Sequence, residues 1–149
     1  MFQINLPTFD IKVSRKNGKT FVFDILRQKY ITLTPEEWVR QHFIHFLIHH
    51  RSFPQALLAN EIELHLNGMS RRCDTVLYRK DLTPQLIVEY KAPHISITQK
   101  VFDQISRYNQ VLHVDYLIVS NGMEHYCCKM NYEQLSYTFL HDIPFYANL

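Results

Sequence analysis

The sequence predicts a mixed α/β (α+β) fold in which helices flank a central sheet, and three observations support this. Two long segments have the apolar periodicity of amphipathic helices, while the segments around them alternate at period two as strands do. One segment, residues 85–91 (QLIVEYK), is apolar on both faces, as in a strand covered on each side. The 149 residues are 46% hydrophobic with only three glycines and six prolines, which suits one domain, residues 1–149, with its own core.

The N-terminal part predicts a hairpin over about residues 10–26, followed by a helix. Apolar residues alternate on both sides of Asn17-Gly18, a dipeptide that tolerates the positive φ angles of a type I′ turn. Thr34 is a suitable N-cap, Pro35 fits the first helical position, and Glu37 completes a Thr-x-x-Glu capping box. The apolar stripe that follows indicates a helix ending near residues 51–54, where a proline disfavours further helical geometry.

The remaining elements complete a core over about residues 34–122. Ser96, with Gln99 three residues later, is expected to open a second helix that runs to about Leu112. The C-terminal segment, about residues 124–140, predicts one or two further strands. The strands between and after the helices are expected at 56–66, 71–79, 85–91 and 114–120.

The residues that carry chemistry are Asp74, Glu89 and Lys91. Residues two apart in a strand point to the same face, so Glu89 and Lys91 would stand side by side. Antiparallel pairing with the preceding strand could place Asp74 beside Glu89, and two carboxylates with a backbone carbonyl are ligands that Mg²⁺ prefers. The alternative is a structural Glu–Lys pair on an edge strand with Asp74 in a turn, because E-x-K triplets are weak signals.

The wider pattern resembles the PD-(D/E)xK nuclease superfamily, and within it the N-terminal domain of type I restriction enzyme R (HsdR) subunits in a small stand-alone form. The resemblance spans about residues 22–122 and includes RRCDTVLY with Asp74, LIVEYKAP with Glu89 and Lys91, and Gln104-x-x-x-Tyr108. It implies a restriction-endonuclease-like core of helix, three strands, helix and strand. The chain contains no helicase motor, methyltransferase or specificity domain, so only the nuclease module of such enzymes carries over.

The resemblance also implies a role for each matched residue. Asp74, Glu89 and the Tyr90 backbone carbonyl would bind Mg²⁺ or Mn²⁺, and Lys91 would be the catalytic lysine. Gln104 and Tyr108 would support the metal site or contact the DNA backbone. Glu37 is either an extra metal ligand or simply the acid of the capping box, and the capping box is the favoured reading. The basic residues expected to contact DNA beside the site are Arg72, Lys100 and Arg107.

Other features exclude functions more than they suggest them. The net charge is only +2, no glycine-rich phosphate loop is present, and the three cysteines form no disulfide framework. No signal peptide or membrane span is visible, so the expected location is the cytoplasm, with no membrane partner. The histidines of the first helix fit a structural face better than a zinc site. The aromatic residues fall mostly at core-like positions and do not predict a base-stacking platform.

Two functions from different classes follow from these observations. The first is a Mg²⁺-dependent endonuclease domain that hydrolyses phosphodiester bonds of DNA, with Asp74 and Glu89 holding the metal beside Lys91. The alternative is a non-catalytic DNA- or protein-binding module that retains the nuclease fold. A lone site cuts one strand, so duplex cleavage would require a homodimer or a separate motor or DNA-recognition subunit.

Overall fold

The structure is a computed structural model that describes residues 2–66, 68–110 and 112–149, with the side chains of Leu66 and Tyr108 outside this description. Its main sheet has six strands in the order β4-β5-β6-β7-β8-β9, and only the β6–β7 pair is parallel. The predicted mixed α/β fold, with the order helix, three strands, helix and strand, is confirmed. The strands are β4 (Leu58–Leu66), β5 (Met69–Tyr78), β6 (Pro84–Tyr90), β7 (Tyr116–Ser120), β8 (His125–Asn131) and β9 (Ser136–Phe139).

The two helices start at side-chain caps. Helix α1 (Pro35–His50) begins where the sequence predicts, with Thr34 Oγ1 accepting the Glu37 backbone N–H at 3.1 Å. Helix α2 (Gln99–Gln110) begins later than predicted, because Thr98 rather than Ser96 caps it, accepting the Val101 N–H at 3.2 Å. Two short 3₁₀ turns, η1 (Gln55–Leu57) and η2 (Tyr146–Asn148), complete the helical elements. Within the described ranges, neither helix has the length and apolar character needed to cross a membrane.

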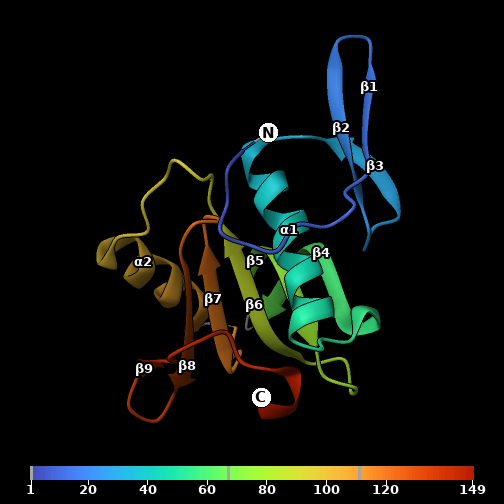
Figure 1. Cartoon of the computed structure of the whole chain (residues 1–149). Helices are drawn as coiled ribbons and strands as arrows, with labels where there is room; N and C mark the ends of the chain where they lie inside the picture. Colours follow the sequence, from blue (N-terminus) through green and yellow to red (C-terminus); the bar gives the residue numbers. More distant parts are fainter. Residues whose placement is uncertain (1, 67, 111) are drawn as a thin grey trace.

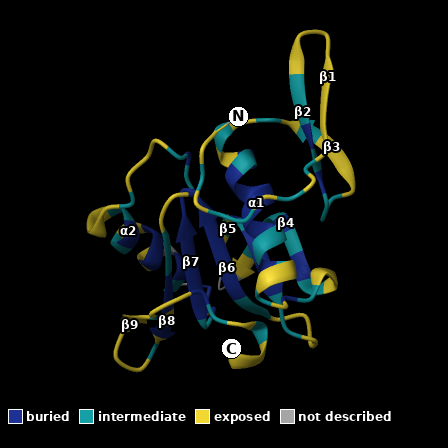
Figure 2. Cartoon of the chain, in the orientation of Figure 1, coloured by how far each residue is buried: buried dark blue, intermediate teal, exposed yellow. Residues whose placement is uncertain are grey.

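The helices cover opposite faces of the main sheet (Figure 1). Val39, Phe43 and Leu47 of α1 pack in one apolar cluster with alternate residues of β5, β6 and β7. Phe102 and Ile105 of α2 pack in a second cluster with the residues on the other face of the same strands. Strands β6 and β7 are therefore buried on both sides, as the apolar run at 85–91 predicts (Figure 2).

A separate three-stranded antiparallel sheet precedes α1 and projects away from the main sheet (Figure 1). It contains β1 (Val13–Lys16), β2 (Lys19–Asp24) and β3 (Lys29–Thr32), and we call residues 12–32 the β-arm. The predicted hairpin is confirmed, since Asn17 and Gly18 have φ angles of 54° and 75° between β1 and β2. The third strand was not predicted, because a four-residue strand leaves too short an alternation to recognise.

Buried hydrogen bonds attach the base of the β-arm to the main sheet. The Asp24 carboxylate caps the turn after β2 by accepting the N–H groups of Leu26 and Arg27. Its Oδ2 also accepts a hydrogen bond from Asn60 Nδ2 of β4 at 3.0 Å. Arg27 pairs with the same carboxylate at 2.6 Å. Because Asp24 is fully buried and bonded on both sides, the arm leaves the main sheet in a defined direction.

Gly122 closes the turn after β7, and Gly122→Ala is expected to destabilise the protein by about 2–4 kcal/mol. Its φ is +85°, and an added Cβ would lie 2.8 Å from Ile4 Cγ2, so both backbone strain and a steric clash follow. Gly18→Ala is the matched control, because Gly18 has a φ of +75° but nothing within 4 Å of the added carbon. Urea unfolding should show the larger loss for Gly122→Ala, and equal losses would mean that the contact with Ile4 is unimportant.

Candidate active site

The candidate site lies where β5 and β6 separate at the carboxyl end of β6. The regular pairing of these strands runs from Leu77↔Leu86 to Thr75↔Val88, and the same register sets Asp74 opposite Glu89. Here the Asp74 side chain takes the place of a backbone acceptor, since Oδ2 accepts the Tyr90 N–H at 2.9 Å. The two carboxylates that the sequence singles out are therefore brought together at the end of the strand pair.

Glu89 is held in a setting that disfavours its charge. Its side chain is 11% exposed, whereas that of Asp74 is 28% exposed. Burial, and then the neighbouring Asp74 carboxylate, raise the pKa of Glu89 to about 7. The Arg71 guanidinium donates to Glu89 Oε1 at 2.9 Å and opposes this rise without cancelling it. A cation between the two carboxylates would relieve their repulsion.

Lys91 directly follows β6 and is half-buried. Its backbone N–H donates to Ser120 O at 2.8 Å, which continues the parallel pairing with β7 and fixes the position of the residue. Strand alternation places its side chain on the same face as Glu89. Across the residues that the structure describes, no hydrogen bond or ion pair occupies the Lys91 ammonium group, so it is available to a bound molecule.

Arg40 and Glu61 also belong to the site, although the sequence did not single them out. The Arg40 guanidinium is buried and lies 3.4 Å from Glu37 and 4.0 Å from Asp74. Burial alone would lower its pKa, but the carboxylates of Glu37 and Glu61 outweigh this and raise it. Glu61 bonds to both Arg40 and Arg72 and has a φ of +56°, a strained value for a non-glycine residue. In β4, Glu61 lies between Asn60 and Ile62, which pair with Thr75 and Cys73 on either side of Asp74, and its left-handed backbone is not visible in sequence.

Glu37 reaches this group from α1. Its backbone N–H takes part in the predicted cap, but its carboxylate lies within bonding distance of Arg27, Arg40 and Gln41. Burial raises the pKa of Glu37, and the Arg40 charge and the Gln41 hydrogen bond oppose the rise. Arg40 thus links Glu37 to Asp74. Among the described residues the Glu37 carboxylate accepts no hydrogen bond from the Thr34 N–H, so the reciprocal bond of the expected capping box is not formed, and the carboxylate is part of the polar surroundings of the site.

Comparison with known proteins identifies the family. A family described as the type I restriction enzyme R protein N terminus (HSDR_N) matches residues 35–144. The chain belongs to this family. A solved structure described as a fragment of an HsdR subunit of a type I restriction enzyme from Vibrio vulnificus YJ016 shares the fold, with a TM-score of 0.51 and 17% sequence identity. The match covers 75% of this chain and 24% of that one, so this chain spans about a quarter of its length. None of the curated proteins matches.

Of the other residues expected to act in this HsdR-type domain, those whose side chains the structure describes lie at its surface. Gln104 is exposed on α2, and Tyr108 lies in the same helix with its side chain outside the described part. Lys100 and Arg107 are also exposed on α2. Arg72 is 69% exposed, with Nε 2.6 Å from Glu61. The structure therefore does not join Gln104 to the acidic pair through any contact among the described residues.

The donor set suits a hard cation with few protein ligands. Asp74 and Glu89 supply carboxylate oxygens, and Mg²⁺ commonly keeps several water ligands beside one or two carboxylates. The Tyr90 carbonyl points away from Ser120, because the next N–H in the same trans peptide donates to Ser120, so it faces the β5 side with Asp74. Among the described residues there is no preformed cluster of three or more His, Cys, Asp or Glu side chains that could hold a metal ion.

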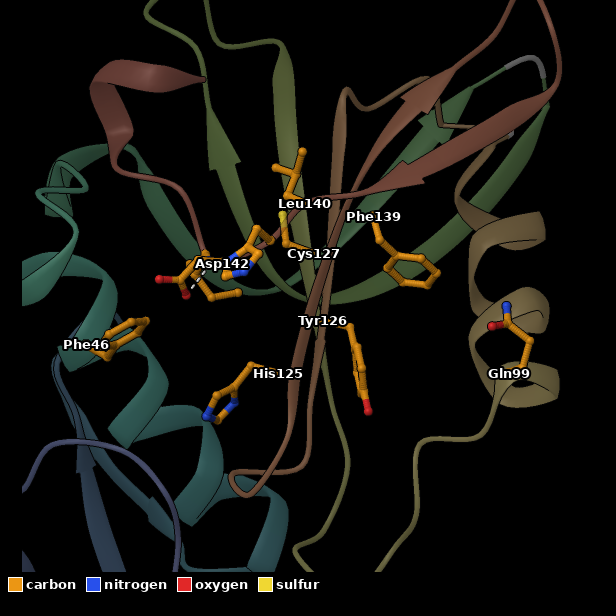
Figure 3. Close-up of a pocket in the computed structure, with 10 residues that line it drawn as sticks. Phe46, Gln99, His125, Tyr126, Cys127, Phe139, Leu140 and Asp142 are labelled. Atoms are coloured by element: carbon orange, nitrogen blue, oxygen red, sulfur yellow. Dashed lines mark hydrogen bonds between the residues drawn. The ribbon is translucent and has the colours of Figure 1, made fainter.

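A pocket of about 450 Å³ between β8, β9 and the C-terminal segment is separate from this site (Figure 3). Phe46, Tyr126 and Phe139 are among the side chains around it, and none of the acidic pair or Lys91 lines it. His125, the one imidazole of β8 at its edge, already has both ring nitrogens bonded, to Ser120 at 2.7 Å and to the Asn5 carbonyl at 3.1 Å.

Glu89→Gln is expected to stabilise the fold increasingly as pH rises from about 4.5 to 7. Over this range folded Glu89 keeps a proton that the unfolded chain has lost, so the wild-type free energy of unfolding falls with pH, whereas glutamine does not titrate. The free energy of unfolding of Glu89→Gln should exceed that of wild type by roughly 2–3 kcal/mol at pH 8. This gain is reduced by the stabilisation that is lost with the Arg71–Glu89 ion pair. Urea unfolding at pH 5 and pH 8 measures it. Glu63→Gln, an exposed change on β4, is the control, and a gain independent of pH would contradict the buried-acid assignment.

Proposed function

We propose that this chain is a metal-dependent nuclease domain that hydrolyses phosphodiester bonds of DNA. The observation that carries the proposal is the meeting of Asp74 and Glu89 where β5 and β6 separate. The Lys91 ammonium, which has no bonded partner among the described residues, follows directly after β6. Membership of the restriction enzyme R N-terminal family supports it. Asp74, Glu89 and the Tyr90 carbonyl would hold Mg²⁺ or Mn²⁺, with Glu37 and Arg40 behind them.

Each residue of the site would have a separate role in phosphodiester hydrolysis. A bound Mg²⁺ would acidify a water molecule and neutralise charge on the phosphate. Lys91 would orient the attacking water or stabilise the negative charge that grows on the phosphate oxygens. Arg71 would balance the charge of Glu89 until the site is loaded, since it lies 2.9 Å from that carboxylate. Gln104, Tyr108, Arg72, Lys100 and Arg107 remain proposed contacts to the DNA backbone.

The test is cleavage of supercoiled plasmid and labelled oligonucleotides with Mg²⁺ or Mn²⁺. We expect wild-type protein to cut and Asp74→Ala to be inactive, with calorimetric Mn²⁺ binding lost in the same variant. Met69→Ala is a suitable control, because Met69 is exposed at the start of β5 and far along the strand from Asp74. Cleavage that survives Asp74→Ala would refute the assignment. If duplex is only nicked, a second copy or a motor or DNA-recognition subunit is the partner to supply next.

The second candidate is a DNA- or protein-binding module that keeps the nuclease fold without catalysis. One observation favours it: Glu89 already pairs with Arg71, and Asp74 lies 4.0 Å from Arg40, so cationic side chains already neutralise the acids. Salt-sensitive DNA binding without cleavage by any divalent metal, and no heat on Mn²⁺ titration, would support this function and exclude the first.

A further inference from the structure

The two faces of the β-arm differ in composition. Residues that pair across antiparallel strands share a face, and the pairs Lys16↔Lys19 and Phe23↔Tyr30 lie on one face. Lys12 extends the same face, since its carbonyl accepts the Phe23 N–H and its ammonium lies 5.4 Å from the Phe23 ring. We call this the lysine–aromatic face, and its members are Lys12, Lys16, Lys19, Phe21, Phe23 and Tyr30.

The lysines of this face have no acidic partner among the described residues. Lys12, Lys16 and Lys19 are exposed, and none forms an ion pair with a described carboxylate. Of the nearest acids in sequence, Asp24 is buried on the opposite face. Asp10 lines the same pocket at the base of the arm as Lys12 and Phe23, and among the described residues it forms no ion pair with Lys12. Figure 2 shows that the outer part of the arm is exposed. The face is therefore a local positive surface, although the chain as a whole carries only +2.

The aromatic side chains of this face do not serve the core. Phe21 and Phe23 are half-buried and Tyr30 is 49% exposed, and none of the three belongs to either apolar cluster. These three are exceptions to the expectation that the aromatic residues fall mostly at core-like positions. Phe21 and Phe23 are two residues apart on one strand, about 7 Å, a separation that suits two bases of an extended strand.

The arm is anchored close to the candidate active site. Asp24 at the end of β2 bonds to Asn60 of β4, and Asn60 bonds through Thr75 to the hydroxyl of Tyr90. From the turn after β2, Arg27 lies 3.5 Å from Glu37, whose neighbour Arg40 is 4.0 Å from Asp74. The base of the arm therefore lies close to the place where cleavage is proposed to occur, and the contacts that hold it there come from the face that carries Asp24.

We propose that the lysine–aromatic face of the β-arm binds single-stranded DNA. Lysines would contact the phosphates and the aromatic rings would stack on unpaired bases, the combination typical of surfaces that bind single strands without reading their sequence. A duplex would use only the lysines, because its base faces are already stacked, so the rings favour an unpaired strand. The choice of DNA rests on the proposed nuclease function, whereas the stacking surface rests on the arm alone.

The test is fluorescence anisotropy of a labelled 15-nucleotide oligothymidylate with the full chain in EDTA, where no cleavage occurs. Lys16→Ala/Lys19→Ala is expected to weaken binding at least about tenfold at 0.1 M salt and to reduce the salt slope by about 1.4. Arg15→Ala/Lys29→Ala is the matched control: it removes the same charge from the opposite face of the same arm, and binding should stay within about twofold. Equal losses in both pairs would overturn the proposal.

The contribution of the rings is tested separately at Tyr30, the most exposed of the three. Tyr30→Ala should weaken binding about 5- to 150-fold, and Tyr30→Phe should keep it, because stacking needs only the ring. A labelled duplex that binds as tightly as the single strand would also overturn the proposal. These assays contain no metal, so they test the arm separately from cleavage. If the wild-type protein binds through the arm but does not cleave DNA with Mg²⁺ or Mn²⁺, the nuclease function is refuted and this inference stands.

Discussion

Replacing Lys91 with methionine is expected to lower Mg²⁺-dependent DNA cleavage about 10²- to 10⁴-fold, the usual contribution of one positioned acid–base or charge-stabilising group. Methionine keeps the length and apolar stem of lysine and removes only the ammonium group. Since that group has no bonded partner among the described residues, the free energy of unfolding should change by less than about 0.5 kcal/mol. Single-turnover cleavage and urea unfolding measure the two effects.

Two further variants show whether the ammonium group itself is responsible. Lys91→Arg keeps the charge but replaces a compact donor with a planar fork, so it should recover only part of the lost rate. Lys80→Met removes an exposed lysine from the turn between β5 and β6, at the other end of the strand pair, and should cleave like wild type. If Lys91→Met retained more than a fifth of the wild-type rate, the lysine would have no role beside the reacting phosphate.

Local sequence patterns are enough to predict most of this fold. The Thr34–Pro35 start of α1 depends on a cap within four residues, and the Asn17-Gly18 turn depends on two φ angles. Both are decided by neighbours in sequence, and both predictions are confirmed. The start of α2 is different: Ser96 and Thr98 are both acceptable caps, and only the structure shows that Thr98 is used.

The candidate site was only partly predictable, because some of its members depend on tertiary pairing. Strand alternation places Glu89 with Lys91, and the pairing of adjacent strands places Asp74 beside Glu89. Arg40 has no such pattern, since it occupies one helical position among apolar residues and meets Asp74 only after folding. The left-handed Glu61 backbone in β4 likewise has no local signal, because a glutamate ordinarily avoids that conformation.

Cleavage by wild-type protein at a low Mg²⁺ concentration is expected to rise with pH up to about pH 7 and then level off. Glu89 must lose its proton to bind a metal, and burial beside Asp74 raises its pKa to about 7. Each unit of pH below that value should therefore lower the rate about tenfold, as long as the metal does not saturate the site. Cleavage rates from pH 5.5 to 8.5 at two Mg²⁺ concentrations measure this, and the higher concentration should move the midpoint to lower pH.

Substitution of Arg71 tests whether deprotonation of Glu89 sets the pH dependence of cleavage, since the charge and hydrogen bond of Arg71 oppose the rise in the pKa of Glu89. In Arg71→Gln the midpoint of the pH–rate profile for cleavage should move to higher pH. Arg79→Gln removes the partner of Asp115 near the far end of β5 and should leave this midpoint unchanged. Metal binding at pH 6 should release close to one proton in wild type, seen as a calorimetric heat that depends on the buffer. A pH profile that ignores both the metal concentration and Arg71 would mean that some other group limits the reaction, because a proton on Glu89 competes directly with the metal for the same oxygen atoms.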